Sequence, residues 1–156
     1  MFTDNNFELW THSIEYIKDA TYYYSLWNGD YAFKQITAVD GTISAGGGME
    51  YPNITIIGET SNANELETVI MHEVGHNWFY GMLGSNERDH AWMDEGINTF
   101  YEQKTTKELE KDKKQSKKKK LDEAAVYFQR AATGGDQAIE QTSANFEKLN
   151  YGLDIY

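Results

Sequence analysis

The chain has 156 residues, a formal net charge of −11 at pH 7 and no cysteine. A chain of this length can bury a hydrophobic core, and the lack of cysteine excludes a disulfide framework and a thiolate metal site. No window of about eighteen apolar residues occurs, so we expect no membrane span. Residues 1–6 lack the basic region followed by an apolar run that is typical of a signal peptide. We make no prediction of where in the cell the protein is located.

The N-terminal third combines one helical pattern with several strand-like ones. From Phe7 to Leu26, apolar residues recur every three or four positions, which predicts an amphipathic helix that residues 28–30 end. Strands are predicted over residues 33–39, 42–45 and 54–57. The second strand runs into Gly46, Gly47 and Gly48, and such a run permits another group to approach the backbone closely.

Glu50 follows the glycines and precedes Pro52. Because proline cannot donate to a β-ladder, its position favours a strand start or an edge strand. An exposed edge beside a catalytic site would let an extended peptide lie along it, main chain to main chain. From the residues alone, the simpler interpretation of Glu50 is a solvent-facing strand residue.

The stretch from His72 to His76 reads His-Glu-Val-Gly-His. Histidines four residues apart leave the same face of an α-helix, so both imidazoles can bind one Zn²⁺. Glu73 would lie beside the metal, where it can take a proton from a water molecule that zinc activates. The alternative is that both histidines lie on a solvated helix face.

We predict that the helix around this motif runs from Glu65 to about Gly81. Asn62 or Asn64 can cap its start. Its buried stripe would consist of Leu66, Val69, Ile70 and Val74. The aromatic residues Trp78, Phe79 and Tyr80 are interpreted as core residues.

Eighteen residues separate His76 from Glu95, which lies in the sequence Trp-Met-Asp-Glu-Gly. This spacer lets the first helix end and a second helix, predicted from near Met93 to about Leu109, pack back against it. Two histidines and one carboxylate leave a fourth tetrahedral position for water, which is the arrangement of catalytic zinc sites. Ile97, Phe100 and Tyr101 would form the apolar side of the second helix. Thr99 could hydrogen-bond to a metal ligand, whereas His12 and His90 lack ligand spacing and are interpreted as surface residues.

Residues 104–120 are strongly basic and hold nine of the fourteen Lys and Arg residues. The segment could bind nucleic acid or an acidic surface. It lacks interleaved aromatic residues for base stacking, so we favour a solvated, mobile helix end and expect no nucleic-acid partner. Helical stretches are predicted over residues 121–132 and 139–149.

These motifs resemble those of the gluzincin aminopeptidases of the aminopeptidase N type. That family carries HExxH, an eighteen-residue spacer and a glutamate in a W-x-x-E-G context, all of which occur here. Its upstream G-x-M-E-N segment is similar to residues 47–51, Gly-Gly-Met-Glu-Tyr. The resemblance covers roughly Ala32 to Phe100.

The resemblance implies a thermolysin-like α+β fold, with a small mixed sheet and an exposed edge strand packed on helices. It implies one Zn²⁺ on His72, His76 and Glu95, with Glu73 as the catalytic base. Residues 47–50 (Gly47, Gly48, Met49, Glu50) would bind substrate, and Glu50 would bind its free α-amino group. A downstream catalytic tyrosine is also implied, for which Tyr156 is the better candidate by its distance from Glu95 and Tyr151 the alternative.

We therefore hypothesise that residues 1–156 are the truncated catalytic domain of a zinc aminopeptidase that acts on peptides with a free N-terminus. The resemblance also implies flanking domains in the parent chain, one rich in β-structure before this region and one helical after it. Three alternatives stay open: an endopeptidase on the same fold, an inactive zinc-binding fragment, and a binding module built on the basic segment. The Gly47–Glu50 segment disfavours the endopeptidase.

Overall fold

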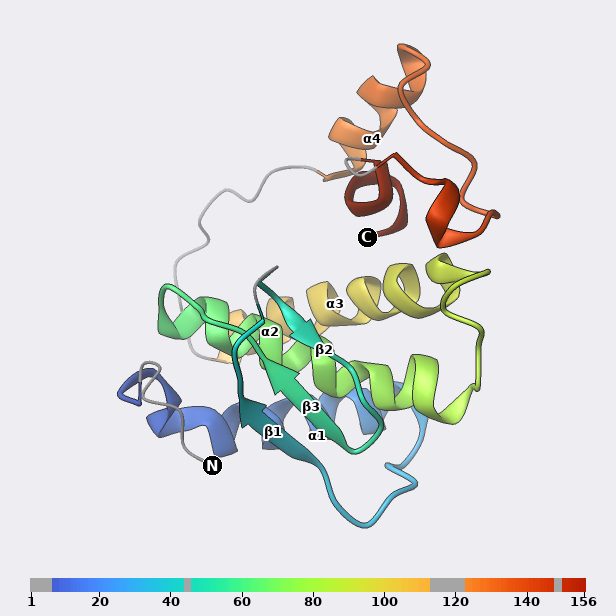
Figure 1. Ribbon diagram of the computed structural model, residues 1–156. Coiled ribbons are helices and arrows are strands. Elements are labelled where there is room, and N and C mark those ends of the chain that lie inside the picture. Colours follow the sequence, from blue (N-terminus) through green and yellow to red (C-terminus); the bar gives the residue numbers. More distant parts are fainter. Residues whose placement is uncertain (1–6, 44–45, 113–122, 148–149) are drawn as a thin grey trace.

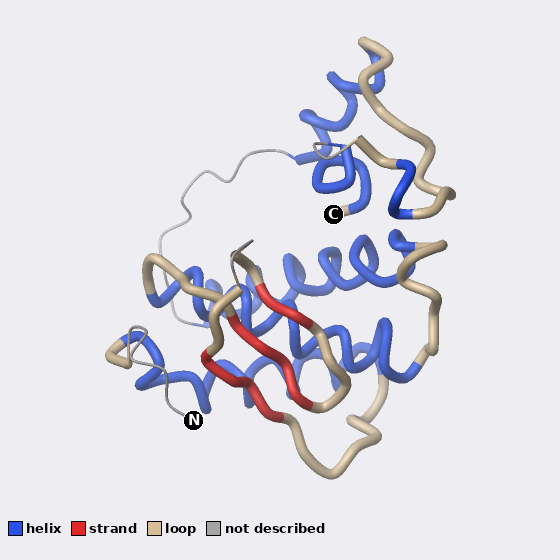
Figure 2. The backbone as a smooth tube through the Cα atoms, viewed as in Figure 1, coloured by secondary structure: helices blue, strands red, loops and turns tan. Residues whose placement is uncertain are grey.

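The computed structural model describes residues 7–43, 46–112, 123–147 and 150–156. The α-helices are α1 (Ser13–Asn28), α2 (Ala63–His76), α3 (Ile97–Asp112) and α4 (Glu123–Ala132), with 3₁₀ turns η1 (Leu9–His12) and η4 (Ser143–Asn145). Three π-helical turns are η2 (Asn77–Met82), η3 (Trp92–Gly96) and η5 (Tyr151–Ile155). The strands lie on one side of α1 and α2, and α4 and the C-terminal segment lie beyond α3 (Figures 1 and 2).

The strands β1 (Thr37–Asp40), β2 (Gly48–Met49) and β3 (Ile54–Ile57) form one sheet in the order β1-β3-β2. β1 runs parallel to β3 and β2 runs antiparallel to it, so the small mixed sheet packed with helices is as expected. β2 is an edge strand, and Glu50 is the residue directly after it. The thermolysin-like arrangement of the whole domain remains a prediction.

Several predicted strand limits were wrong. Residues 33–36 are not in a strand, and β1 begins only at Thr37. Thr42 and Ile43 are not in a strand either, and residues 44–45 lie outside the described residues. Pro52 lies just before β3, in agreement with the strand start that was one of its two interpretations, whereas the edge-strand alternative was wrong because β3 pairs on both sides. Thr42 and Ile43 are β-branched, and such residues favour strands. In the structure they instead belong to the loop that leads to the short edge strand β2.

The helix α2 is the centre of the core. It packs against α1, α3 and β3. Leu66, Ile70 and Val74 are fully buried, as predicted, whereas Val69 is only partly buried. Because its neighbours cover several sides, the helix that carries the two histidines is held firmly in place.

The start of α2 is fixed by a cap. The side chain of Asn62, and not that of Asn64, accepts a hydrogen bond from the Glu65 backbone N–H at 3.0 Å. Glu65 in turn accepts from the Ser61 backbone N–H at 2.7 Å, which closes the first turn. The helical path continues through η2, where Trp78 and Phe79 are buried and Tyr80 is partly exposed.

The second predicted helix consists of η3 and α3, which carry Glu95 back against α2. Phe100 does not belong to its buried side, because 61% of its surface is exposed. Lys104 to Asp112 form the C-terminal part of α3, and the Lys104 ammonium lies 4.1 Å from the centre of the Trp27 ring. That the basic segment is mobile stays a prediction. Residues 113–120 of the predicted basic segment lie outside the described residues.

The C-terminal part was predicted only partly. α4 agrees with the helix expected over residues 121–132, of which 121–122 lie outside the described residues. Residues 139–149 do not form one helix: only η4 is helical there, and residues 148–149 are not described. Among the described helices, none combines the length and apolar character needed to cross a bilayer.

Candidate metal centre

Three side-chain atoms converge between α2 and η3. Nε2 of His72 lies 3.1 Å from Nε2 of His76 and 3.1 Å from Oε2 of Glu95. The third side, from His76 Nε2 to Glu95 Oε2, measures 3.3 Å. Ligands about 2.0–2.1 Å from a tetrahedral zinc ion lie roughly 3.3–3.4 Å apart. The sides of the triangle are therefore close to the ligand separations around a zinc ion, two of them slightly shorter.

The other ring nitrogen of each histidine faces a carboxylate. Nδ1 of His72 lies 3.0 Å from Glu102 Oε2, and Nδ1 of His76 is hydrogen-bonded to Asp94 Oδ1. A carboxylate accepts the Nδ1 proton, which leaves the Nε2 lone pair directed into the triangle. This donor set fits a zinc ion, because two neutral imidazoles and one carboxylate are ligands that zinc accepts.

The same carboxylates change the acidity of the imidazoles. Burial lowers the pKa of His72, but its hydrogen bonds to Glu102 and Glu95 outweigh burial and raise the pKa to about 9. Burial opposes the charge on His76 as well, and its hydrogen bonds to Asp94 and Glu95 raise that pKa to about 10. A metal ion must displace these protons to bind.

Glu73 lies on α2 beside the triangle and is almost completely buried. Burial raises the pKa of its carboxyl to about 7. One carboxylate oxygen, Oε2, has no hydrogen-bond partner among the described residues. The edge strand approaches Glu73 closely, because a Cβ atom at Gly48 would overlap the Glu73 carboxylate. Any larger residue at this point of the strand would displace the Glu73 side chain.

A cavity of about 290 Å³ opens beside the triangle and brings most of the predicted site residues together. Its lining includes Gly47, Gly48, Glu50, His72, Glu73, Glu95 and Tyr156. Met49 is not among the lining residues, and its carbonyl accepts a hydrogen bond from the Thr55 hydroxyl at 3.0 Å. The cavity thus extends from the edge strand to the C-terminal residue.

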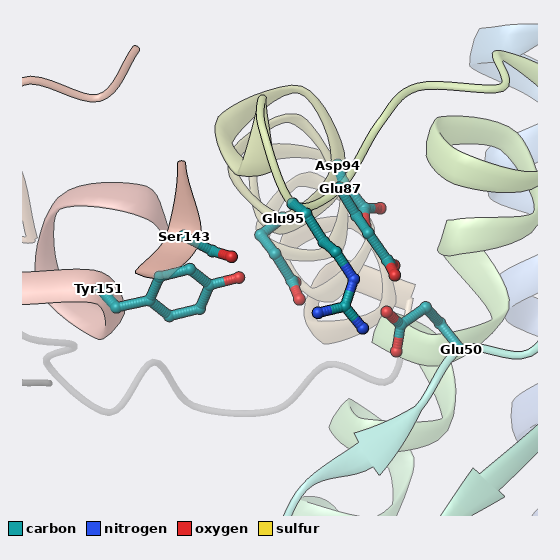
Figure 3. A pocket seen from close by; sticks show the side chains of 7 residues that line it. Glu50, Glu87, Asp94, Glu95, Ser143 and Tyr151 are labelled. Carbon is teal, nitrogen blue, oxygen red and sulfur yellow. The ribbon is translucent and has the colours of Figure 1, made fainter. Parts of the chain in front are cut away.

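A second hollow of about 170 Å³ shares Glu50 and Glu95 with the first. Figure 3 shows Tyr151 and Ser143, from the C-terminal segment, pointing toward the Glu95 carboxylate, with Glu50 on the opposite side of the hollow. Burial raises the pKa of Glu50, so its carboxylate lacks the hydration of an exposed side chain. A cation between Glu50 and Glu95 would replace that hydration.

The two candidate tyrosines lie at different places. The Tyr156 ring stacks on the His72 ring, with 5.7 Å between centroids and 20° between planes. Tyr151 lines only the second hollow, and its ring centroid lies 6.1 Å from that of Tyr156. Burial and the charge of Glu95 hold the pKa of Tyr156 well above its usual value, so its hydroxyl keeps its proton.

Sequence reasoning missed Asp94 and Glu102, the two carboxylates behind the histidines. Glu102 follows Glu95 by seven residues, or about two helical turns, so a shared helix face was the available signal. The prediction for Thr99 was wrong, because its buried hydroxyl has no hydrogen-bond partner among the described residues. His12 is exposed and pairs with Glu15, whereas His90 is only partly exposed and pairs with Glu140.

The sequence matches the Peptidase family M1 domain over residues 11–154. The chain belongs to peptidase family M1. No solved structure matches it with significant similarity.

Two curated relatives are named aminopeptidases. Leucine aminopeptidase 2-1 of Meyerozyma guilliermondii is 35% identical over 60 residues, which are 37% of this chain and 10% of the relative. Aminopeptidase Q of Mus musculus is 29% identical over 92 residues, which are 52% of this chain and 16% of the relative. This M1 chain therefore spans about a tenth of the length of the first relative and about a sixth of the length of the second.

Proposed function

We propose that this M1 peptidase chain is the catalytic core of a zinc-dependent aminopeptidase. The observation that carries the proposal is the triangle of His72, His76 and Glu95, whose sides of 3.1–3.3 Å suit one zinc ion. The carboxylates behind both imidazoles support the same assignment, since metal-bound histidines usually donate their second N–H to such a group.

Glu73 and Tyr156 would each have a separate task beside the zinc ion. Zinc would polarise the scissile carbonyl and acidify the attacking water. Glu73 accepts a proton from that water and passes it to the leaving amine, and its pKa of about 7 suits a base that works near neutral pH. Tyr156 donates its hydroxyl hydrogen to the developing oxyanion, a contribution typically worth about 10²–10³ in rate.

Glu50 is assigned to the free amino group of the substrate. A peptide paired with the outer edge of β2 would extend toward Glu50. The partly buried Glu50 carboxylate would pair with the terminal ammonium and stop further entry of the peptide. The substrate class is therefore peptides with a free N-terminus.

Zinc binding near pH 7 should release protons from the imidazoles of His72 and His76, whose pKa values are about 9 and about 10. Their Nε2 atoms are only 3.1 Å apart, so two positive charges there oppose each other. We expect release of at least about one proton per zinc ion and an affinity that rises as the pH approaches 9. Calorimetry in buffers with different ionisation enthalpies measures the release. Binding without proton release at pH 7 would contradict imidazole ligation.

A free-amine peptide should be cleaved far faster than its N-acetylated twin. Acetylation removes the charge that pairs with Glu50 and leaves a partly buried carboxylate without a partner, which weakens binding of the acetylated peptide. Glu50→Ala should shrink the difference, mostly by slowing cleavage of the free-amine peptide. The measurement is the ratio of the two kcat/KM values.

An exposed glutamate, Glu59, supplies the control for this comparison. Glu59→Ala should leave the ratio unchanged. Equal cleavage of both peptides by the unmutated protein would make it an endopeptidase instead.

A further inference from the structure

A fully buried amide lies directly behind the metal centre. Asn98 follows Glu95 by three residues on the same helical segment, and none of its surface is exposed. Its Nδ2 donates to the backbone carbonyl of His72 at 2.8 Å. Its Oδ1 accepts from the Tyr24 hydroxyl at 3.0 Å. One side chain thus joins α3 to α2 and α1.

The connection reaches both histidines through the backbone. In an α-helix, the carbonyl of residue 72 also accepts from the N–H of residue 76. The oxygen bound by Asn98 therefore belongs to the helical turn that holds His72 and His76. On the other helix, Asn98 is less than one turn from Glu95.

Gly75 provides the space for this contact. A Cβ atom at Gly75 would overlap both Asn98 Oδ1 and the Tyr24 ring. The glycine inside the His-Glu-Val-Gly-His sequence therefore lets the polar cluster of Asn98 and Tyr24 lie against α2. Van der Waals packing alone does not need an amide here, since a small apolar residue could fill the gap.

We propose that Asn98 is the positioning residue that sets the register between Glu95 and the two histidines. A hydrogen bond with a distance window of about 2.7–3.2 Å fixes how far α3 can slide along α2. A slide of about 1 Å would open the ligand triangle, and sites become poor when ligands are misplaced by that amount. The inference rests on the proposed zinc site.

The test uses the chain as it is, with Zn²⁺ for affinity and Co²⁺ as a spectroscopic probe. Asn98→Leu keeps nearly the same shape and removes the amide. We expect its zinc dissociation constant to rise about 10–100-fold, the usual effect of losing an outer partner of a metal site. The visible absorption of bound Co²⁺ should change as well, because it reports ligand geometry.

Two further variants separate register from stability. Tyr24→Phe removes the hydroxyl that donates to Asn98 but keeps the hydrogen bond from Asn98 to the His72 carbonyl. This variant should therefore have a lower Tm, while its zinc affinity should change less than about threefold. In Asn98→Leu the Tyr24 hydroxyl keeps only the backbone carbonyl of residue 98, at 3.3 Å, as an acceptor. Adding Tyr24→Phe removes this weakly bonded hydroxyl and should recover part of the lost stability, since replacing both partners by apolar groups is nearly neutral. Its zinc affinity should stay low.

The outcomes distinguish the two proposals. If the unmutated chain binds neither Zn²⁺ nor Co²⁺, the proposed function and this inference both fail. If it binds them and Asn98→Leu binds equally well, only the role of Asn98 is overturned. The same holds if affinity follows Tm across the three variants, because Asn98 would then act through stability alone.

Discussion

Replacing Glu73 with glutamine should leave zinc binding intact and slow the hydrolysis of an aminoacyl substrate by about 10²–10⁴. The amide occupies the space of the carboxylate beneath Gly48, so the cavity keeps its shape. It cannot accept the proton of the attacking water. The measurement pairs kcat with zinc content, using a form of the protein that turns over an aminoacyl anilide.

Glu59→Gln serves as the matched control, because Glu59 is an exposed glutamate that does not line the cavity. It should keep full activity. Turnover by the Glu73 variant within a few-fold of the unmutated protein would remove Glu73 from the mechanism.

Replacing His72 with alanine should abolish stoichiometric zinc binding. The change removes one of three ligands, leaves Glu102 without its histidine partner and takes away the ring on which Tyr156 stacks. We expect a loss of affinity larger than the roughly 10–100-fold that follows removal of an outer partner. Equilibrium dialysis at dilute zinc, followed by metal analysis, measures it.

His12→Ala is the control for this experiment, since His12 is exposed and pairs only locally with Glu15. It should bind one zinc ion per chain, like the unmutated protein. Full zinc retention by the His72 variant at dilute metal would overturn the ligand assignment.

Local patterns were sufficient to predict α2 and the candidate ligands. The spacing of Leu66, Ile70 and Val74 defines the buried face, and His72 and His76 are four residues apart on another face. Asn62 caps the helix through a contact within a few residues. These features depend on residues that are close together in the sequence, so they can be predicted without knowing how the rest of the chain folds.

Contacts between distant segments could not be predicted in the same way. Glu102 pairs with His72 across 30 positions, and Asn98 bonds to the His72 carbonyl across 26. Their roles depend on how α3 lies against α2, which periodicity does not define. The strand prediction failed at Thr42 and Ile43 for a related reason, since strand propensity depends on which neighbour is available for pairing.

The stacking of Tyr156 on His72 also has a consequence for the order in which the site forms during synthesis. Tyr156 lies 61 positions after Glu95, so a ribosome adds it roughly 3–12 s after the last proposed metal ligand. The proposed ligands belong to α2 and to the continuous segment of η3 and α3, and these elements contact one another directly in the folded chain. We therefore expect a nascent chain to hold all three proposed metal ligands before the proposed oxyanion donor, Tyr156, has been added.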